Sequence, residues 1–221
     1  MLPQRTIRSF TRRARHLSPT KQKVFEELWP SYGIDLATLF NNSNSPISKP
    51  LVLEIGFGYG EHLFHWAAAN ENKNFLGAEI HCPGIANLLA LLAVRPLNNL
   101  KIYQGDVVEL LQQAAPGIFE EVAILFPDPW PKRRHQKRRL IQPDFIRLLH
   151  EKITCGGILQ IATDWEDYAE QIKTLFYNSN FFSSLKNEAI DSYARRAVIT
   201  RFEQRGLAKN HRIFNLTYVN R

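Results

Sequence analysis

From residue 50 onward the sequence alternates between short apolar runs and longer segments whose apolar residues have helical spacing. The runs are rich in Leu, Ile and Val and have the length of buried strands. Strands that alternate with helices predict right-handed crossovers and a mostly parallel sheet covered on both faces, so the expected class is α/β. The expected strands are 51–55, 74–79, 100–103, 121–126 and 157–162, and the expected helices are 61–69, 83–94, 106–114, 143–152 and 165–178.

The two ends of the chain differ from this pattern. Residues 212–219 alternate between apolar and polar side chains, which predicts a strand that pairs antiparallel at the end of the sheet. The Ser-Pro pair at 18–19 predicts the start of a helix, and Pro30 its end. The turn-rich segment 41–46 follows. We therefore expect a basic N-terminal arm and helix over residues 1–45 and one main domain over 46–221.

The net charge of +7 comes from two basic segments. Residues 1–23 hold seven Lys and Arg and residues 132–139 hold six more, and neither segment contains Asp or Glu. Outside them, 15 cations face 21 anions. The second run lacks the interleaved Glu that would relieve its self-repulsion, which favours contact with a polyanion such as a nucleic-acid backbone. A solvated helical face is the alternative.

The chain shows no sign of a membrane or metal protein. No apolar stretch approaches the roughly 18 to 20 residues of a membrane span. The two cysteines, Cys82 and Cys155, form neither a disulfide framework nor a zinc pattern, so we expect no metal and a reducing, cytoplasmic setting. The Arg-rich, acid-free start is also typical of mitochondrial presequences, so import stays open as an alternative.

The first expected strand runs into a turn with Gly56, Gly58 and Gly60. Glycines at alternate positions let the backbone turn sharply and approach a ligand, although a turn without a ligand is also consistent with them. Glu61 occupies the third small position of the dinucleotide fingerprint, where a carboxylate would repel a pyrophosphate. The turn therefore favours a ligand without phosphates, and a dehydrogenase is the least favoured activity.

Carboxylates stand at or near the ends of the first three strands. Glu79 is placed to accept the hydroxyls of a ribose. Asp106 could accept adenine N6 or only cap the next helix, and Glu54 could hold a cationic end of the ligand indirectly. A ligand with a ribose, an adenine and an ammonium group but no phosphate is S-adenosylmethionine, which is the expected cofactor.

A proline-rich segment, residues 126–131, follows the fourth strand. Its three prolines exclude a helix or strand and stiffen the chain, so Asp128 and Trp130 are held where the sheet opens. This favours a preordered site, although the prolines could simply end a buried strand. Trp130 could stack on a base or fill the loop core. Thr163 or Asp164, at the end of the fifth strand, could cap the next helix, and residues 200–206 lack clear periodicity and predict a loop.

Six blocks of the sequence resemble those of the bacterial tRNA (guanine-N7)-methyltransferases, the TrmB family. The resemblance covers nearly the whole chain, and its most specific part is FPDPWPKRRHQKRR at 126–139. The other matching blocks are LEIGFGYG (53–60), GAEIH (77–81), GDVVELL (105–111), ATDWEDYAE (162–170) and TRFEQRG (200–206). The segment 81–100 departs from the family pattern by its few charges, which we expect to concern only a surface connection.

The resemblance implies a class I methyltransferase (Rossmann-like) fold, with a mostly parallel seven-stranded sheet, helices on both faces and an antiparallel strand near the C-terminus. It implies S-adenosylmethionine as donor, tRNA as partner and methylation of N7 of guanosine 46 in the variable loop, with Asp128 as the catalytic residue. It also implies cofactor contacts from Glu54, Gly56, Gly58, Gly60, Glu79, Asp106 and Asp128. Substrate contacts would come from Lys132, Asp164, Thr200, Arg201, Phe202 and Glu203, and RNA contacts from Arg134, Lys137, Arg138 and Arg139.

Guanine N7 carries a lone pair and no proton, so we expect placement rather than a strong base to dominate catalysis. Asp128 would orient the guanine edge or stabilise its developing positive charge. Two rivals remain. One is methylation of an exocyclic amine, because residues 128–130 resemble the loop that orients an amino nucleophile; the other is an RNA-binding module with a vestigial pocket. Whether the protein is a monomer or a homodimer stays open.

Overall fold

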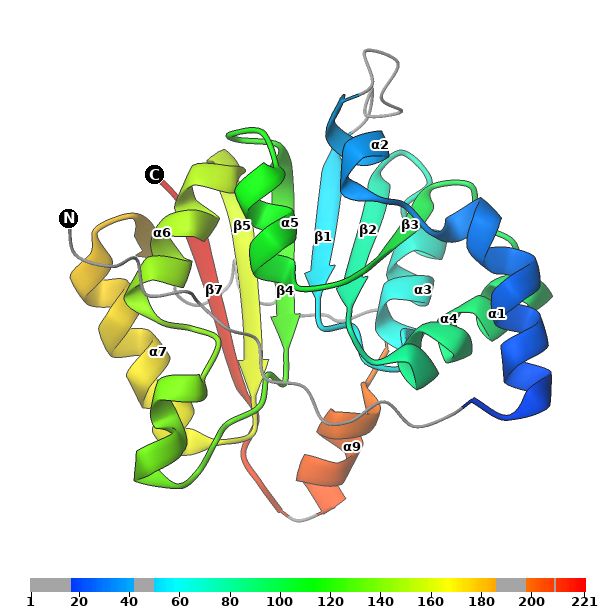
Figure 1. The fold of residues 1–221 in the computed structure, drawn as a ribbon. Coiled ribbons are helices and arrows are strands. Elements are labelled where there is room, and N and C mark those ends of the chain that lie inside the picture. Colours follow the sequence, from blue (N-terminus) through cyan, green and yellow to red (C-terminus); the bar gives the residue numbers. More distant parts are fainter. Residues whose placement is uncertain (1–16, 42–49, 186–197, 209) are drawn as a thin grey trace.

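The computed structural model describes residues 17–41, 50–185, 198–208 and 210–221. Within them, seven strands form one sheet in the order β3-β2-β1-β4-β5-β7-β6 (Figure 1). The first five strands are parallel, and β7 runs antiparallel to β5 and β6. The strands are β1 Leu51–Ile55, β2 Asn74–Glu79, β3 Leu100–Gln104, β4 Phe119–Leu125, β5 Ile153–Thr163, β6 Phe182–Ser184 and β7 Phe214–Asn220.

The five internal strands expected from the sequence are confirmed, with shifts of one to four residues at some ends. The C-terminal strand is antiparallel, as expected, but it does not form the end of the sheet. β6 pairs on its outer side, with Phe182 opposite Asn220. The sequence analysis did not predict β6 because a strand of three residues is too short to show alternation.

The helices cover both faces of the sheet. They are α1 Pro19–Tyr32, α2 Leu36–Asn41, α3 Glu61–Ala69, α4 Cys82–Val94, α5 Val107–Gln113, α6 Pro143–Lys152, α7 Glu166–Ser179 and α9 Arg201–Ala208, with a 3-10 helix, η1, at Arg133–Arg138. Successive side chains of a strand point to opposite faces. Leu51, Leu53 and Ile55 of β1 therefore join the core beneath α5, α6 and α7, whereas Val52 joins the core beneath α3 and α4.

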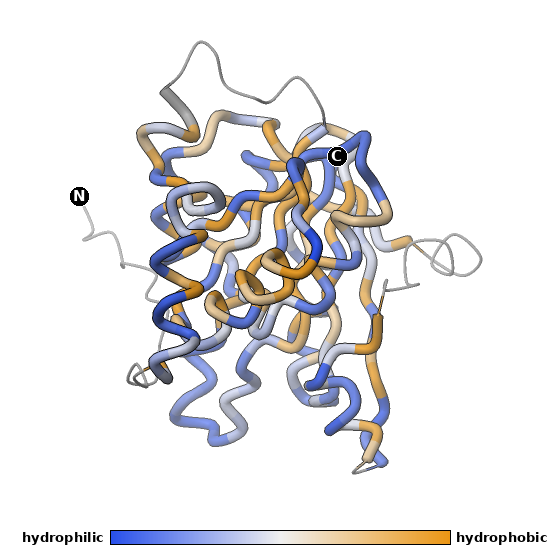
Figure 2. The backbone as a smooth tube through the Cα atoms, turned by 90° about the vertical axis from the view of Figure 1, so that its right-hand side faces the viewer, coloured by the Kyte–Doolittle hydropathy of each residue, from blue (hydrophilic) through white to orange (hydrophobic). Residues whose placement is uncertain are grey.

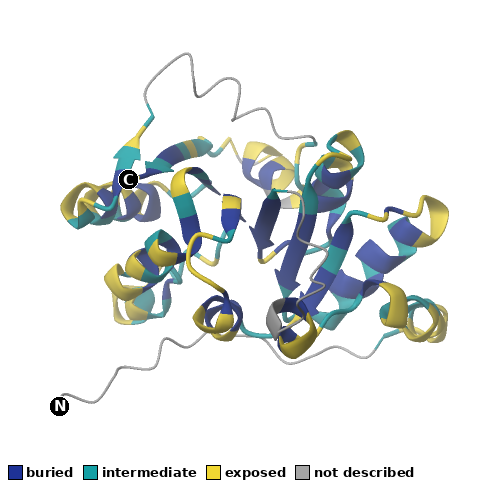
Figure 3. Cartoon of the chain, turned by 90° about the horizontal axis from the view of Figure 1, so that it is seen from above, coloured by how far each residue is buried: buried dark blue, intermediate teal, exposed yellow. Residues whose placement is uncertain are grey.

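This arrangement places apolar residues inside and charged residues outside. The strands are the most deeply buried elements, and exposed residues gather on the outward sides of the helices (Figure 3). Along the chain, apolar stretches follow the sheet and hydrophilic stretches follow the outer turns and helices (Figure 2). The result is a rigid sheet whose strand ends carry the polar side chains.

α4 is a core helix, so the expected surface connection over 81–100 is wrong. Ile85, Leu88 and Leu89 are 0% exposed. One side of α4 packs on the sheet, and its other side packs on α1, where Phe25 and Leu28 join the same core. A helix covered on both sides needs apolar residues all round, which explains the few charges in this segment.

α1 continues past Pro30, where the sequence predicted its end. A proline in the last turn removes only one helical hydrogen bond, and the Gly33 N–H still donates to the Trp29 carbonyl at 2.7 Å. The helix is tied to the main sheet region, because the Lys101 ammonium donates to the Ser31 carbonyl at 2.6 Å. The division of the chain at residues 45 and 46 stays a prediction.

α9 is a helix where the sequence predicted a loop. Thr200 precedes its first residue, and the Thr200 Oγ1 accepts a hydrogen bond from the Glu203 N–H at 3.1 Å. Thr and Glu three residues apart are the pattern of a capping box, so a helix start was visible in the sequence. α9 has only 8 residues, which are too few to show a clear helical periodicity in the sequence.

Candidate cofactor and RNA site

The candidate site lies at the carboxyl ends of the parallel strands, near the boundary between β1 and β4. Strand order reverses there, and in open α/β sheets ligands bind at this point. The Gly56 N–H donates to the Ala78 carbonyl and the Phe126 N–H to the Ala162 carbonyl, each at 2.8 Å, so the segments that leave neighbouring strands start side by side. α9 lies beyond the carboxyl ends of β1 and β4 (Figure 1).

The glycine turn after β1 has the conformation that its sequence requires. Gly56, Gly58 and Gly60 all have positive φ, at 68°, 59° and 80°. A Cβ built on Gly56 would meet no atom within 4 Å, so open space borders this part of the turn. The turn shares a pocket with Leu125 at the end of β4 and with Thr200 and Arg201 next to it. The glycine turn, the end of β4 and the start of α9 therefore lie together around one pocket.

Glu79, at the end of β2, is fixed by backbone donors. Its Oε1 accepts from the N–H groups of Ile80 and His81 at 2.7 and 2.9 Å, and its Oε2 accepts from the Gly58 N–H at 2.8 Å. A carboxylate can accept about four hydrogen bonds, so room remains for a ligand hydroxyl. Glu79 thus joins the glycine turn to the end of the neighbouring strand.

Asp106 follows β3 and caps the next helix. Its Oδ1 accepts from the Val108 N–H at 2.9 Å, which is the capping role that the sequence left as an alternative. The Gly105 N–H donates to the Glu79 carbonyl at 3.2 Å. The carboxylates predicted at the ends of β2 and β3 therefore lie on adjacent strands at one edge of the sheet.

Glu54 is buried and paired, with only 2% of its surface exposed. A hydrogen bond of 2.9 Å joins its Oε2 to Nδ1 of His62, which is also buried. Glu54 lies on the face of β1 that α3 covers, because it alternates with Leu53 and Ile55 on the other face. Sequence reasoning missed His62, since no motif marks a partner that only the packing of α3 supplies.

The segment after β4, residues 126–131, is neither helix nor strand, as its prolines predicted. Phe126 and Trp130 have positive φ, at 53° and 42°, which is uncommon for bulky residues. Asp128 lies between them and is exposed. The Arg138 guanidinium lies 5.1 Å from the centre of the Trp130 ring, and the His135 ring meets its edge at 5.9 Å. These contacts favour the loop-core role of Trp130.

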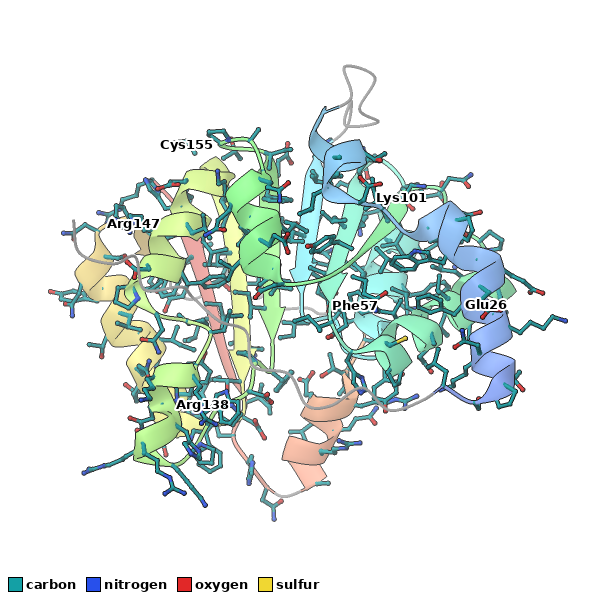
Figure 4. The ribbon with its side chains drawn as sticks, in the orientation of Figure 1. Glu26, Phe57, Lys101, Arg138, Arg147 and Cys155 are labelled. Atoms are coloured by element: carbon teal, nitrogen blue, oxygen red, sulfur yellow. The ribbon has the colours of Figure 1, made fainter. Side chains whose placement is uncertain are left out.

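The basic segment 132–139 is mostly exposed. Lys132, Arg134 and Lys137 are exposed, and Arg138 is half-buried against Trp130. Arg138 belongs to η1 and lies in the lower part of the view in Figure 4. Desolvation and the surrounding cations, Arg138 foremost, lower the pKa of His135.

Arg139 differs from the expectation of an RNA contact, because it is 2% exposed and faces inward. Its Nε donates to the Pro129 carbonyl at 2.7 Å, and an ion pair of 2.5 Å joins Nη2 to Asp167 Oδ2. Nη1 donates to the Gln171 side chain. Sequence reasoning missed these two partners on α7, which lie about 30 residues further along the chain.

The start of α9 contacts the glycine turn through Arg201. Its Nε donates to Glu61 Oε1 at 2.7 Å, and its guanidinium lies 4.6 Å from the centre of the Tyr59 ring. Glu203 is buried at 8% exposure, and only the backbone of Phe202 is described. The sequence therefore predicted the position of this segment near the site, although it missed the helix.

Asp164, after β5, does not cap α7. Its Oδ2 lies 3.1 Å from Nδ1 of His211, and the helix begins without a side-chain cap. Thr163 Oγ1 accepts instead from the Trp165 N–H at 3.2 Å. Asp164 is also close to α9, because a Cβ on Gly206 would lie 3.1 Å from its side chain. The end of β5 and α9 therefore lie at the same edge of the sheet.

The strand order, the antiparallel β7 and the glycine turn after β1 define a class I methyltransferase. The 16S rRNA methyltransferase KamB has the same fold, with a TM-score of 0.54, 16% identity and coverage of 97% of this chain and 99% of that one. A phosphoethanolamine N-methyltransferase of Haemonchus contortus in complex with S-adenosyl-L-methionine gives a TM-score of 0.50, with 13% identity and coverage of 92% of this chain and 57% of that one.

Sequence comparisons define the family more narrowly. Residues 48–216 match the family model described as "Putative methyltransferase". The tRNA (guanine-N(7)-)-methyltransferase of Nitrosococcus oceani is 45% identical, over 97% of this chain and 91% of that protein. The protein of the same name from Methylococcus capsulatus is 41% identical, over 98% and 95%. The chain belongs to the tRNA (guanine-N7)-methyltransferase family.

Two other features bear on what the protein binds. Among the described residues, no group of three or more His, Cys, Asp and Glu side chains is arranged to hold a metal ion. In the same part of the chain, every helix is too short or too polar to span a membrane.

Proposed function

We propose that the protein transfers a methyl group from S-adenosylmethionine to N7 of guanosine 46 in the variable loop of tRNA. The observation that carries this proposal is the arrangement at one edge of the sheet. The glycine turn and Glu79 lie on one side of the strand-order reversal, and Asp128 with the basic segment 132–138 lies on the other. A cofactor pocket and an RNA surface would then meet at the same strand ends.

The residues present fit S-adenosylmethionine. Glu79 would accept the ribose hydroxyls, and Asp106, which caps α5, would also accept the adenine amine. The open space beside Gly56 suits close contact with a ligand, and Glu54 with His62 would brace the turn from beneath. When bound, S-adenosylmethionine supplies an electrophilic methyl group on a sulfonium.

Catalysis would rest on placing the acceptor nitrogen. Guanine N7 has a lone pair and no proton, so no residue has to remove one. Asp128 is exposed in the segment that follows β4 and would accept the N1–H and N2–H groups of the guanine edge, with Asp164 as a second acceptor. As the methyl arrives, the purine becomes cationic, and the same carboxylate stabilises that charge. Alignment of this kind accounts for several kcal/mol of a barrier.

The exposed cations Lys132, Arg134, Lys137 and Arg138 would contact the tRNA backbone and fix its position without reading bases. At the start of α9, Thr200, Arg201 and Glu203 would hold the substrate next to the cofactor. Phe202 belongs to the same set of predicted substrate contacts. The basic residues of the N-terminal arm would add phosphate contacts; residues 1–16 lie outside the described residues.

We further propose that the protein acts in the cytoplasm, since Cys82 and Cys155 are free thiols, as a reducing compartment requires.

Incubation with methyl-labelled S-adenosylmethionine and total tRNA, followed by nucleoside analysis with mass spectrometry, tests the proposed reaction. We expect the label in 7-methylguanosine. Label in N2-methylguanosine or N6-methyladenosine would instead show methylation of an exocyclic amine. Tight tRNA binding with no label and no binding of S-adenosylmethionine by calorimetry would show a non-enzymatic RNA-binding module.

A further inference from the structure

One cation of the basic segment faces the protein interior. The side chain of Arg139 is 1% exposed, whereas Arg138 is half-buried and Lys137 is exposed. Its guanidinium donates to three acceptors: the Pro129 carbonyl, Asp167 and Gln171. It also lies 4.8 Å from the centre of the buried Tyr168 ring. The group is therefore surrounded by partners from the proline-rich segment and from α7.

These contacts leave the guanidinium no access to a phosphate. Moving it to the surface would break the bond to Pro129 and expose the apolar packing around Tyr168. A buried charge is tolerated only when its donors are satisfied, and here each nitrogen has an acceptor. The planar, five-donor geometry of arginine suits three acceptors in different directions, which a lysine could not all reach.

The segment that Arg139 contacts has few backbone donors of its own. Pro127, Pro129 and Pro131 have no N–H to donate, and Phe126 and Trp130 occupy left-handed conformations that cost energy. Such conformations persist only when the surroundings fix them. The bond from Arg139 Nε to the Pro129 carbonyl, 2.7 Å long, provides that support one residue after Asp128.

We infer that Arg139 is a positioning residue: it anchors the 126–131 segment to α7 and thereby fixes Asp128 against the guanine. This inference rests on the proposed function for its consequence, but the anchor itself is a property of the free protein. The basic segment then has two parts: surface cations that contact RNA, and the inward-facing Arg139, which sets the geometry of the site. A misplacement of about 1 Å at a reacting centre can lower the rate by roughly 10²-fold.

The test compares R139Q, R138Q and R147Q. Arg147 is the matched control, because it forms an exposed ion pair with Asp144 and lies far from Arg138 (Figure 4). We expect R139Q to lower kcat for methyl transfer by roughly 10²-fold, with wild-type tRNA affinity and wild-type salt dependence. R138Q should weaken tRNA binding and reduce the salt slope by about 0.7 to 0.9. R147Q should match the wild type in all three.

A second measurement does not depend on activity. The indole N–H signal of Trp130 in the NMR spectrum, assigned with Trp130→Phe, should shift or broaden in R139Q and stay unchanged in R147Q. R139K keeps the charge but not the planar donors, so it should resemble R139Q in this signal. If R139Q no longer unfolds cooperatively on heating, D167N replaces it, because this variant removes one partner of the same guanidinium. We expect the same lower kcat and the same change in the Trp130 signal.

Two results would overturn the inference. A salt slope reduced in R139Q as in R138Q would show that Arg139 contacts a phosphate. An unchanged Trp130 signal together with wild-type kcat would show that Arg139 anchors nothing. If the wild-type protein itself makes no 7-methylguanosine, the proposed function fails, and the Trp130 signal alone decides whether the anchor exists.

Discussion

At the scale of single residues, the proposed chemistry depends most on Asp128. This carboxylate is exposed, three residues after the end of β4. We therefore expect Asp128→Ala to reduce methyl transfer by at least roughly 10²-fold, the typical loss when an aligned polar group is removed. Single-turnover assays would measure it. The melting temperature and tRNA affinity should stay close to wild type, and near-normal turnover would contradict a role for Asp128 in the reaction.

Glu79 allows a separate test of the cofactor pocket. Glu79→Gln removes the charge and turns an amide toward backbone donors, including the Gly58 N–H. Losing an acceptor of this kind costs about 1 to 3 kcal/mol, so the Kd for S-adenosylmethionine should rise roughly tenfold or more in calorimetry. Glu120→Gln, an exposed position at the start of β4, is the control. Equal Kd values in the two variants would remove Glu79 from the pocket.

The sequence predicted which residues lie at the strand ends but not what they touch. Glu54, Glu79 and Asp128 could be placed because carboxyl ends of parallel strands meet at one edge. Their partners could not, since His62 reaches Glu54 only through the packing of α3. The inward orientation of the Arg139 side chain was also not predictable, because a run of like charges does not indicate which residue is buried.

At the scale of elements, the surface of η1 should dominate the salt dependence of tRNA binding. Lys137 is exposed, and Arg138 is half-buried over the face of the Trp130 ring. Each phosphate contact contributes about 0.7 to 0.9 to the slope of log K against log salt, so the double variant K137Q/R138Q should reduce the slope by roughly 1.5. Titrations at several salt concentrations measure this. A wild-type slope in the double variant would exclude η1 as a phosphate-binding element.

His135 makes the same element sensitive to pH. Its pKa is lowered below the ordinary 6.5, so the ring is neutral near pH 7 and gains a positive charge only as the pH falls below 6.5. A bound phosphate favours the charged ring, so tRNA affinity should rise as the pH falls below 6.5. The gain is at most about fivefold, because an exposed charge pair contributes little to binding. His135→Gln should lack this gain; the same pH dependence in both proteins would assign it elsewhere.

Elements with long periodic patterns were predictable and short ones were not. α3, α6 and the parallel strands match the expected ranges closely. β6 and α9 were missed because three and eight residues carry too little periodicity, although Thr200 and Glu203 marked the start of α9. α1 passed Pro30 because packing on α4 outweighs one lost hydrogen bond.

At the scale of the whole molecule, the net charge of +7 is divided by the fold. Glu54 of β1 and Glu79 of β2 lie next to the glycine turn, where a cationic cofactor would bind, and Asp106 follows the neighbouring β3. The exposed cations of the basic segment extend from the same strand ends on the other side of β4. The sequence predicted both groups; only the fold shows that they meet at one edge.

The proposed reaction transfers a methyl group to N7 of one guanosine, and a single tRNA substrate tests it directly. A tRNA with 7-deazaguanosine at position 46 has a C–H group in place of the acceptor nitrogen and is otherwise unchanged. The measurement is the incorporation of labelled methyl groups into this tRNA and into its unmodified counterpart. We expect full labelling of the unmodified tRNA and none of the deaza form, with similar affinity for both. Equal labelling of the two would contradict the claim.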